Sequence, residues 1–281
     1  MEYTLPQFNS KADMFKYLKE NKALLVSQKK HAVKYADAVC YAVPSAPASD
    51  YASKEVAVLM STPEDVAKSI TVKVAINTTN LLDSHGDVHI PGLWKKTLSE
   101  NKNVLLLREH SMKFENVLAQ NVTAYTKRMT WKALGYEYEG STEVLLFETT
   151  IQRKDYTSFM IDRYLEGDVK NHSVGMRYGD LLLCINSEEN WYRDEKENWD
   201  KYISMVANKE AAEELGYFWA VTTAKVIEGS AVVLGSNFAT PTISVQSNKE
   251  TDEADKVTSD NNDGPAETTQ KQSPNYSTIK F

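Results

Sequence analysis

Four short segments of the sequence carry histidines, serines and carboxylates that could do chemistry together. The first spans residues 80–98, and its acidic and imidazole side chains are spaced by two: Asp83, His85, Asp87 and His89. In an extended strand this spacing would place them on one face, where imidazole and carboxylate suit zinc or iron. Gly86 and the Ile-Pro-Gly that follows favour a polar turn instead. A metal site and a turn are both open interpretations.

A histidine ends the second segment, residues 104–110 with the sequence VLLLREH. The apolar run predicts a strand that stops at a charged cluster containing His110. Because the unperturbed pKa of histidine is about 6.5, an imidazole at the end of a strand suits a general base near neutral pH. A surface histidine is the alternative.

The third segment, residues 171–180 with the sequence NHSVGMRYGD, carries a candidate nucleophile. Ser173 lies two residues before Gly175, a small residue that would let a bound substrate approach the backbone closely. In a strand, His172 and Ser173 point to opposite faces, so the neighbouring histidine is a poor base for this serine. The base must come from elsewhere, and His110 is available.

An isolated carboxylate, Glu228, marks the fourth segment, residues 225–241 with the sequence KVIEGSAVVLGSNFATP. It lies between a predicted strand and a Gly-Ser break, where a solvated turn residue is one interpretation. The other is that Glu228 orients a base histidine and stabilises its cationic form.

The elements around these segments predict an α+β fold that is rich in β-structure. Period-2 alternation and β-branched runs predict strands at residues 70–76, 104–107, 117–125, 144–151, 173–178, 181–185, 218–227 and 231–234. Helical patterns are expected at residues 93–100, 156–166 and 199–215. Because strands outnumber helices without alternating strictly with them, we expect a barrel or a curled, mostly antiparallel sheet with surrounding helices.

Composition divides the chain into three parts. Residues 1–65 predict a helical N-terminal extension and linker, with Ser10 capping a helix and prolines ending the helical stretch at residues 43–54. Residues 66–244 form the main domain, with a charged, aromatic insertion at about 187–216 that we expect to pack on the body. Residues 245–281 are expected to be a disordered acidic tail, since residues 249–281 hold seven acids, four lysines and few apolar side chains.

Charge and cysteine content narrow the function classes. The net charge of -7 disfavours nucleic acid as a main partner, and no apolar run approaches the ~20 residues needed to cross a bilayer. The two cysteines, Cys40 and Cys184, have no metal-ligand spacing and fit a reducing compartment such as the cytoplasm. No cofactor is expected.

Taken in order, the four segments resemble those of the tailed-phage prohead maturation proteases, whose fold is related to the herpesvirus assembly protease. The blocks that carry the resemblance are Asp83 with Gly86-Asp87-Val88 and Pro91-Gly92, the strand ending in His110, His172-Ser173-Val174-Gly175-Met176, and Glu228-Gly229-Ser230-Ala231-Val232-Val233. The resemblance covers about residues 68–243. It departs from the family at Leu234-Gly235-Ser236-Asn237, where a Pro-Ala-Asn segment is common, and at His172, where an apolar residue is commoner.

The resemblance implies a serine endopeptidase in which Ser173 is the nucleophile, His110 the general base and Glu228 the orienting acid, with Asp180 the next candidate for the third role. It further implies an oxyanion site at the amides of residues 175–177. The implied substrates are scaffold or capsid-protein delta segments, and the chain itself, inside a phage procapsid in the host bacterial cytoplasm. The major capsid protein and scaffold would be the partners, and relatives of the fold predict a homodimer.

Two other functions remain open at the level of sequence. One is a metal-dependent hydrolase that uses His85, His89 and His110, with Asp87 as a further ligand. The other is a scaffold or structural assembly protein that keeps the protease fold without turnover.

Overall fold

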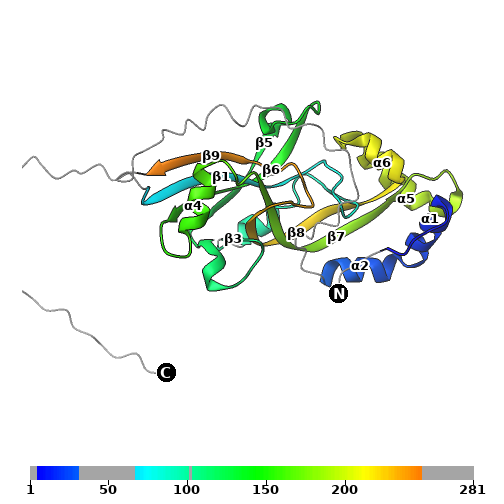
Figure 1. Cartoon of the computed structure of the whole chain (residues 1–281). Helices are drawn as coiled ribbons and strands as arrows, with labels where there is room; N and C mark the ends of the chain where they lie inside the picture. The colour runs from blue at the N-terminus through cyan, green and yellow to red at the C-terminus, as the bar shows by residue number, and fades with distance from the viewer. Residues whose placement is uncertain (1–4, 32–66, 101–102, 249–281) are drawn as a thin grey trace, which may run out of the picture. The chain divides into compact units, whose positions relative to one another are not determined.

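The structure, a computed structural model, describes residues 5–31, 67–100 and 103–248 (Figure 1). Its helices are α1 (Lys11–Glu20), α2 (Lys22–His31), α3 (Lys95–Glu100), α4 (Ser158–Leu165), α5 (Arg193–Tyr202) and α6 (Lys209–Leu215). Its strands are β1 (Ser69–Thr78), β2 (Asp87–His89), β3 (Leu105–Arg108), β4 (Val117–Ala119), β5 (Thr123–Thr130), β6 (Ser141–Gln152), β7 (Asn171–Ile185), β8 (Tyr217–Val232) and β9 (Thr242–Asn248). Short 3₁₀ turns occupy Phe114–Asn116, Lys132–Leu134, Asn190–Tyr192 and Ile203–Met205.

Two open sheets form the body of the described chain. One has the strand order β5-β6-β1-β9 and is antiparallel throughout. In the other, β8 pairs antiparallel with β7 along one side. Along its other side, β8 pairs in parallel first with β2 and further along with β3. β4 pairs antiparallel with β3 and continues the sheet. The α+β class with mostly antiparallel pairing is confirmed. A closed barrel is wrong, because the described strands do not join into a ring.

The core lies between the two sheets. The alternation predicted at residues 70–76 holds, and the side chains on the inner face of β1 are fully buried: Ile70, Val72, Val74 and Ile76. Gly229 of β8 faces this core, because a Cβ atom there would lie 2.7 Å from Phe147 and 2.8 Å from Ile76. Since successive residues of a strand point to opposite faces, Glu228 and Ser230 point away from the other sheet.

The predicted strands are found with altered lengths. Residues 173–178 and 181–185 belong to the single strand β7, and residues 218–227 and 231–234 belong to β8 as far as Val232. Residues 117–125 divide between β4 and β5. Two strands were not predicted: β2, at a position expected to be a polar turn, and β9.

β9 corrects the predicted start of the acidic tail. Residues 245–248 pair with β1, with Val245 opposite Val72, so the ordered body extends beyond residue 244. Residues 249–281, and with them the remainder of the predicted disordered tail, lie outside the described residues.

The N-terminal helices pack on the main body. Ser10 caps α1 as predicted, since its side chain accepts a hydrogen bond from the Asp13 backbone N–H. Phe15, Leu18 and Leu25 are buried in the same core cluster as β1, β7 and β8. We expected residues 1–65 to be an extension, but α1 and α2 belong to the same packed unit as residues 67–248; residues 32–66 lie outside the description.

The insertion at about residues 187–216 is helical, as expected for residues 199–215, although α5 begins earlier, at Arg193. Tyr192, Trp199 and Tyr202 are buried, and α5 lies against β7 and β8. The prediction that the aromatic side chains of this segment pack on the body is confirmed for these three residues. Trp191 is 47% exposed.

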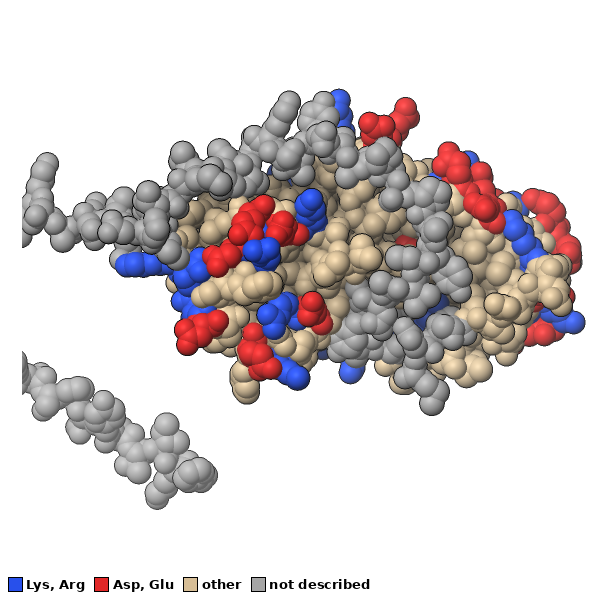
Figure 2. All heavy atoms as spheres, in the orientation of Figure 1, with Lys and Arg blue, Asp and Glu red and all other residues tan. Residues whose placement is uncertain are grey.

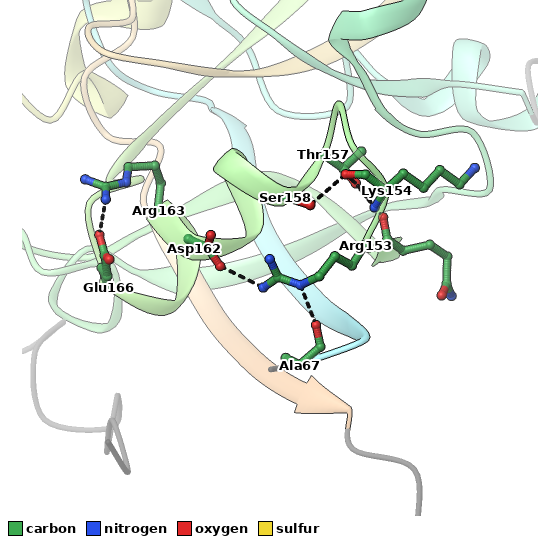
Figure 3. A network of polar contacts seen from close by, with 9 residues as sticks. Ala67, Arg153, Lys154, Thr157, Ser158, Asp162, Arg163 and Glu166 are labelled. Carbon is green, nitrogen blue, oxygen red and sulfur yellow. Dashed lines mark hydrogen bonds and ion pairs between the residues drawn. The ribbon is translucent and has the colours of Figure 1, made fainter. Parts of the chain in front are cut away.

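Helix α4 is tied to the first sheet by a surface network (Figure 3). Arg153, which follows β6, donates from Nε to the Ala67 carbonyl at 2.7 Å and forms an ion pair with Asp162 of α4 at 2.7 Å. Arg163 pairs with Glu166 and Asp168. Figure 2 shows the basic and acidic side chains of this region interleaved on the surface. Because these pairs are exposed, they position α4 more than they stabilise the fold.

In the described ranges, none of the helices is long and apolar enough to cross a membrane. The Cys184 thiol is free and buried, and desolvation by burial raises its pKa. Cys40 lies outside the described residues.

Candidate active site

Three strands of the second sheet place the predicted nucleophile and acid on one face, beside the strand that leads to the predicted base. Ser173 of β7 pairs with Ser230 of β8, and Leu107 of β3 pairs with the same serine from the other side. Directly paired residues share a face of a sheet, and Glu228 lies two residues before Ser230. Ser173, Glu228 and Ser230 therefore point from one face, which we call the site face. It is opposite to the face on which Gly229 meets the core.

His110 and Glu228 are hydrogen-bonded. The His110 Nδ1 atom lies 2.6 Å from Glu228 Oε1. The carboxyl group is fully buried and the imidazole side chain is 7% exposed. In the arrangement that pairs a carboxylate with a neutral imidazole, the carboxylate accepts, Nδ1–H donates, and the lone pair of the ring lies on Nε2. This tautomer is the one that a general base needs, with a buried acid to orient it.

Ser230 completes the contacts around this pair. Its hydroxyl donates to Glu228 Oε2 at 2.7 Å and accepts from the His110 backbone N–H at 3.0 Å. Both carboxylate oxygens of Glu228 are thus engaged, one by the imidazole and one by the hydroxyl. Ser230 is a site residue that was not predicted from the sequence, although its position two residues after Glu228 in a strand could have indicated it.

Gly175 makes room for the carboxylate. It pairs with Glu228 across β7 and β8, and a Cβ atom at this position would lie 2.0 Å from Glu228 Oε1. No side chain fits there unless the carboxylate moves. We interpreted Gly175 from the sequence as a place for close substrate approach; the structure gives it this different role, which depends on the register of the two strands.

The same contact indicates how far the imidazole reaches. His110 enters from the β3 side of β8, whereas Ser173 and Gly175 lie on the β7 side. Glu228 Oε1, which the imidazole contacts, lies beside the position that a Gly175 Cβ would occupy. The ring of His110 therefore extends across β8 toward β7, on the face from which Ser173 points.

The backbone around His110 is strained. Glu109 and His110 follow the end of β3 and have φ values of +53° and +54°, in the left-handed region that residues other than glycine seldom occupy. The Glu109 N–H donates to the Ala231 carbonyl of β8, which holds this turn against the sheet. Such conformations persist only where surrounding contacts impose them, and they concentrate at functional sites.

The segment after β8 passes close to Ser173. A Cβ atom on Gly235 would lie 2.9 Å from the His172 carbonyl oxygen and 3.8 Å from the Ser173 Cβ. Ser173 is 7% exposed in this arrangement. Val233 and Leu234, just before Gly235, are exposed apolar residues. Gly235 thus lies at the edge of the candidate site.

His172 faces away from the site, as its alternation with Ser173 predicted. Its ring is fully buried, with Nε2 2.9 Å from the Tyr164 hydroxyl and Nδ1 3.3 Å from the Thr240 carbonyl oxygen. Desolvation by burial lowers the pKa of His172 to about 4, so the ring is neutral at physiological pH. It is a structural histidine of the core.

The alternative third member, Asp180, lies elsewhere. It pairs with Thr223 in the β7–β8 ladder, five residues along β8 from Glu228. Its carboxylate accepts from the Thr223 hydroxyl and forms a surface ion pair with Lys30. Asp180 is therefore not the partner of His110.

The proposed metal ligands do not come together. Asp87 and His89 pair with β8 at Trp219 and Val221, whereas β3, which leads to His110, pairs with β8 as far as Ala231. Val221 and Ala231 are ten residues apart along β8, and ten residues of extended strand span about 30 Å. His110 therefore lies far from Asp87 and His89. Within the ranges that the structure describes, no three His, Cys, Asp or Glu side chains lie together as a metal site. The ligand set of His85, His89, His110 and Asp87 is wrong.

The segment at residues 80–98 instead combines a turn with the short strand β2. Asp83 accepts from the backbone N–H groups of His85 and Asp87, as in a polar turn. Asp87 forms a buried ion pair with Lys29 of α2 and accepts from the Tyr178 hydroxyl at 2.7 Å. The segment serves to attach the N-terminal helices to the sheet.

The chain was compared with known proteins. Neither the protein-family models, nor the curated proteins, nor the solved structures give a match to this chain. The arrangement of His110, Glu228, Ser230 and Ser173 must therefore be interpreted from its own chemistry.

Proposed function

We propose that this protein is a serine endopeptidase with Ser173 as nucleophile, His110 as general base and Glu228 as the acid that orients the base. The observation that carries the proposal is the buried 2.6 Å contact between His110 and Glu228 on the face from which Ser173 points. A buried carboxylate on the Nδ1 side of an imidazole fixes the tautomer whose Nε2 can accept a proton.

The chemistry is acyl transfer. His110 takes the hydroxyl proton of Ser173 as the serine oxygen attacks a peptide carbonyl carbon, and a tetrahedral intermediate forms. His110 then returns the proton to the leaving amine, and water hydrolyses the acyl-enzyme by the same sequence of transfers. The backbone amides of residues 175–177 are our prediction for the donors that stabilise the oxyanion.

The resemblance to prohead proteases supplies the biological setting of the proposal. The substrates would be delta segments of the major capsid protein or scaffold, and the chain itself, and the place of action would be the procapsid interior in the host bacterial cytoplasm. A fold related to the herpesvirus assembly protease, and a homodimer, belong to the same proposal. The two-sheet α+β body and the order of His110, Ser173 and Glu228 along the chain support it.

A serine-reactive fluorophosphonate probe tests the nucleophile directly. We expect the purified chain to be labelled on Ser173, as located by peptide mass spectrometry, and the Ser173→Ala variant to lose labelling with an unchanged unfolding transition. Ser111→Ala is the matched control, because Ser111 lies just after His110 and its hydroxyl accepts from Asn116. Co-expression with the major capsid protein that the proposal names as substrate then asks whether the parent, but not Ser173→Ala, shortens that protein.

Two results would count against the proposal. Labelling that persists in Ser173→Ala would mean that another residue reacts with the probe. A folded parent chain that is neither labelled nor able to shorten the capsid protein would favour an assembly protein that keeps the fold without turnover.

A further inference from the structure

Two exposed cations lie side by side on the site face, beyond Glu228. Arg177 of β7 pairs directly with Lys225 of β8, and both side chains are exposed. Ser173, Gly175 and Arg177 are spaced by two along β7, so Arg177 points from the same face as Ser173. The register shift between Gly175 and Met176 leaves this alternation intact, because the extra residue, Ile227, is on β8.

This pairing is unfavourable within the chain itself. Like charges directly opposite each other in an antiparallel pair repel and destabilise the ladder. Among the described residues, neither Arg177 nor Lys225 forms an ion pair that would offset the repulsion. The nearby acids are engaged elsewhere, since Asp180 pairs with Lys30 and the buried Glu228 with His110. An anionic group from outside these described residues would relieve the repulsion.

The position of the cation pair relative to Ser173 suggests which anion. Four residues of extended strand separate Ser173 from Arg177, which is about 13 Å. A peptide bound in extended form along β7, with its scissile carbonyl at Ser173, advances by the same distance per residue. A side chain about four residues from the scissile bond would then lie over Arg177 and Lys225.

We infer that Arg177 and Lys225 form a subsite for an aspartate or glutamate side chain of the peptide substrate, about four residues from the bond that Ser173 attacks. The inference rests on the proposed function and adds a sequence preference to it. An exposed ion pair of this kind contributes a modest binding free energy per cation, and this contribution falls as the salt concentration rises. It therefore acts on the choice of substrate while the chemistry stays with the catalytic residues.

A peptide library tests the preference. The full chain is incubated with randomised tetradecapeptides, and cleavages that Ser173→Ala does not produce are identified by mass spectrometry. We expect acidic residues to be enriched at one position three to five residues from the cleaved bond. For a matched pair of peptides with Glu or Gln at that position, the kcat/KM ratio of Glu to Gln should fall about tenfold in Arg177→Gln/Lys225→Gln.

Charge reversal makes the test sharper. In Arg177→Glu/Lys225→Glu, the enriched residues at that position should become lysine and arginine. Lys170→Gln, which neutralises an exposed cation just before β7, is the matched control and should keep the acidic preference. Cleavage by the parent without an acidic preference, or an undiminished preference in the glutamine variant, would overturn the inference.

A binding measurement separates this inference from the proposed function. If the library shows no cleavage that depends on Ser173, the proposed endopeptidase activity fails. The cation pair is then judged by fluorescence anisotropy with labelled dodecapeptide pools that carry either two glutamates or two glutamines. Ser173→Ala protein should bind the glutamate pool more tightly, and neutralising Arg177 and Lys225 should abolish the difference. Equal binding of the two pools by Ser173→Ala would refute the subsite.

Discussion

The His110 imidazole and the Glu228 carboxyl group lie 2.6 Å apart although 118 positions separate them in the chain. The contact follows from the parallel pairing of β3 with β8, in which Leu105 is opposite Glu228 and Leu107 is opposite Ser230. His110 follows the end of β3 with left-handed backbone angles, and its Nδ1 atom contacts the carboxylate. The geometry of the candidate base thus depends on the register of one short strand.

Replacing Glu228 by glutamine should lower turnover strongly without unfolding the protein. The amide keeps the volume of the side chain but cannot hold the His110 tautomer or stabilise the imidazolium. We expect the rate of fluorophosphonate labelling to fall by about 10²- to 10⁴-fold, less completely than in Ser173→Ala. Glu148→Gln, at a partly exposed ion pair with Lys73, is the control and should react like the parent. A parent-like rate in Glu228→Gln would remove Glu228 from the proposed mechanism.

Ser230→Ala should affect stability and turnover together. The change removes the donor to Glu228 Oε2 and leaves the His110 backbone N–H without this acceptor in a largely buried place. Losing such a partner costs about 1–3 kcal/mol, which urea unfolding monitored by tryptophan fluorescence measures. The labelling rate should fall less than in Glu228→Gln, because the imidazole keeps its carboxylate. Ser99→Ala, at an exposed serine of α3, should leave both properties at the parent value; if Ser230→Ala does the same, the hydroxyl has no positioning role.

Gly175→Ala should disturb the catalytic carboxylate through a single methyl group. The added Cβ would lie 2.0 Å from Glu228 Oε1, so either the carboxylate or the strand must shift. We expect a stability loss of about 1–3 kcal/mol together with a large loss of labelling. Gly140→Ala is the contrasting variant, since its Cβ meets open space and its φ of +82° costs only about 1 kcal/mol. If both variants keep full labelling, the room at Gly175 is not required for function.

The candidate base and nucleophile could be predicted from the sequence because they lie at the end of a strand or within one. Apolar runs ending in His110 and the alternation around Ser173 identify elements whose local pattern is strong. Their partners could not be identified in that way. Ser230 and Gly175 acquire their roles from the pairing of β7 with β8, and a one-residue change of register would turn each to the opposite face.

The errors of prediction have a related cause. A turn was predicted at β2 because Gly86 and the Ile-Pro-Gly that follows interrupt a strand pattern, yet Asp87 and His89 form a strand and are buried by contacts from distant parts of the chain. Lys29 of α2 and Tyr178 of β7 satisfy Asp87, and Asn77 of β1 bonds the His89 ring. β9 has a weak local pattern and is a strand because β1 offers it a free edge. Long-range partners decide such segments, and a local pattern does not contain them.

The buried ion pair of Lys29 and Asp87 should hold the N-terminal helices on the body. Lys29 is 1% exposed, and its ammonium group also lies 5.7 Å from the centre of the Trp219 ring. In Lys29→Met, Asp87 loses its buried cation, and we expect a loss of about 3–5 kcal/mol in urea unfolding. Lys29→Met/Asp87→Asn should recover much of that loss, because the buried charge is gone. An unfolding midpoint of Lys29→Met equal to that of the parent would mean that this ion pair does not hold α2 in place.

His172 should make the fold sensitive to acid. Its pKa is lowered by burial to about 4 in the folded chain, against about 6.5 when unfolded. The unfolded chain therefore binds a proton first, so the stability that depends on neutral His172 is complete above pH 6.5 and is lost as the pH falls toward 4. A shift of this size corresponds to about 3 kcal/mol. The free energy of unfolding is measured by urea unfolding at pH 7, 6, 5 and 4. Between pH 7 and pH 4 the parent should lose about 3 kcal/mol more than His172→Gln does. The variant is less stable than the parent at pH 7, because the contacts with Tyr164 and Thr240 are altered. The exposed-site variant His31→Gln should follow the parent, and parallel curves for His172→Gln and the parent would show that the buried imidazole does not set the acid limit of the fold.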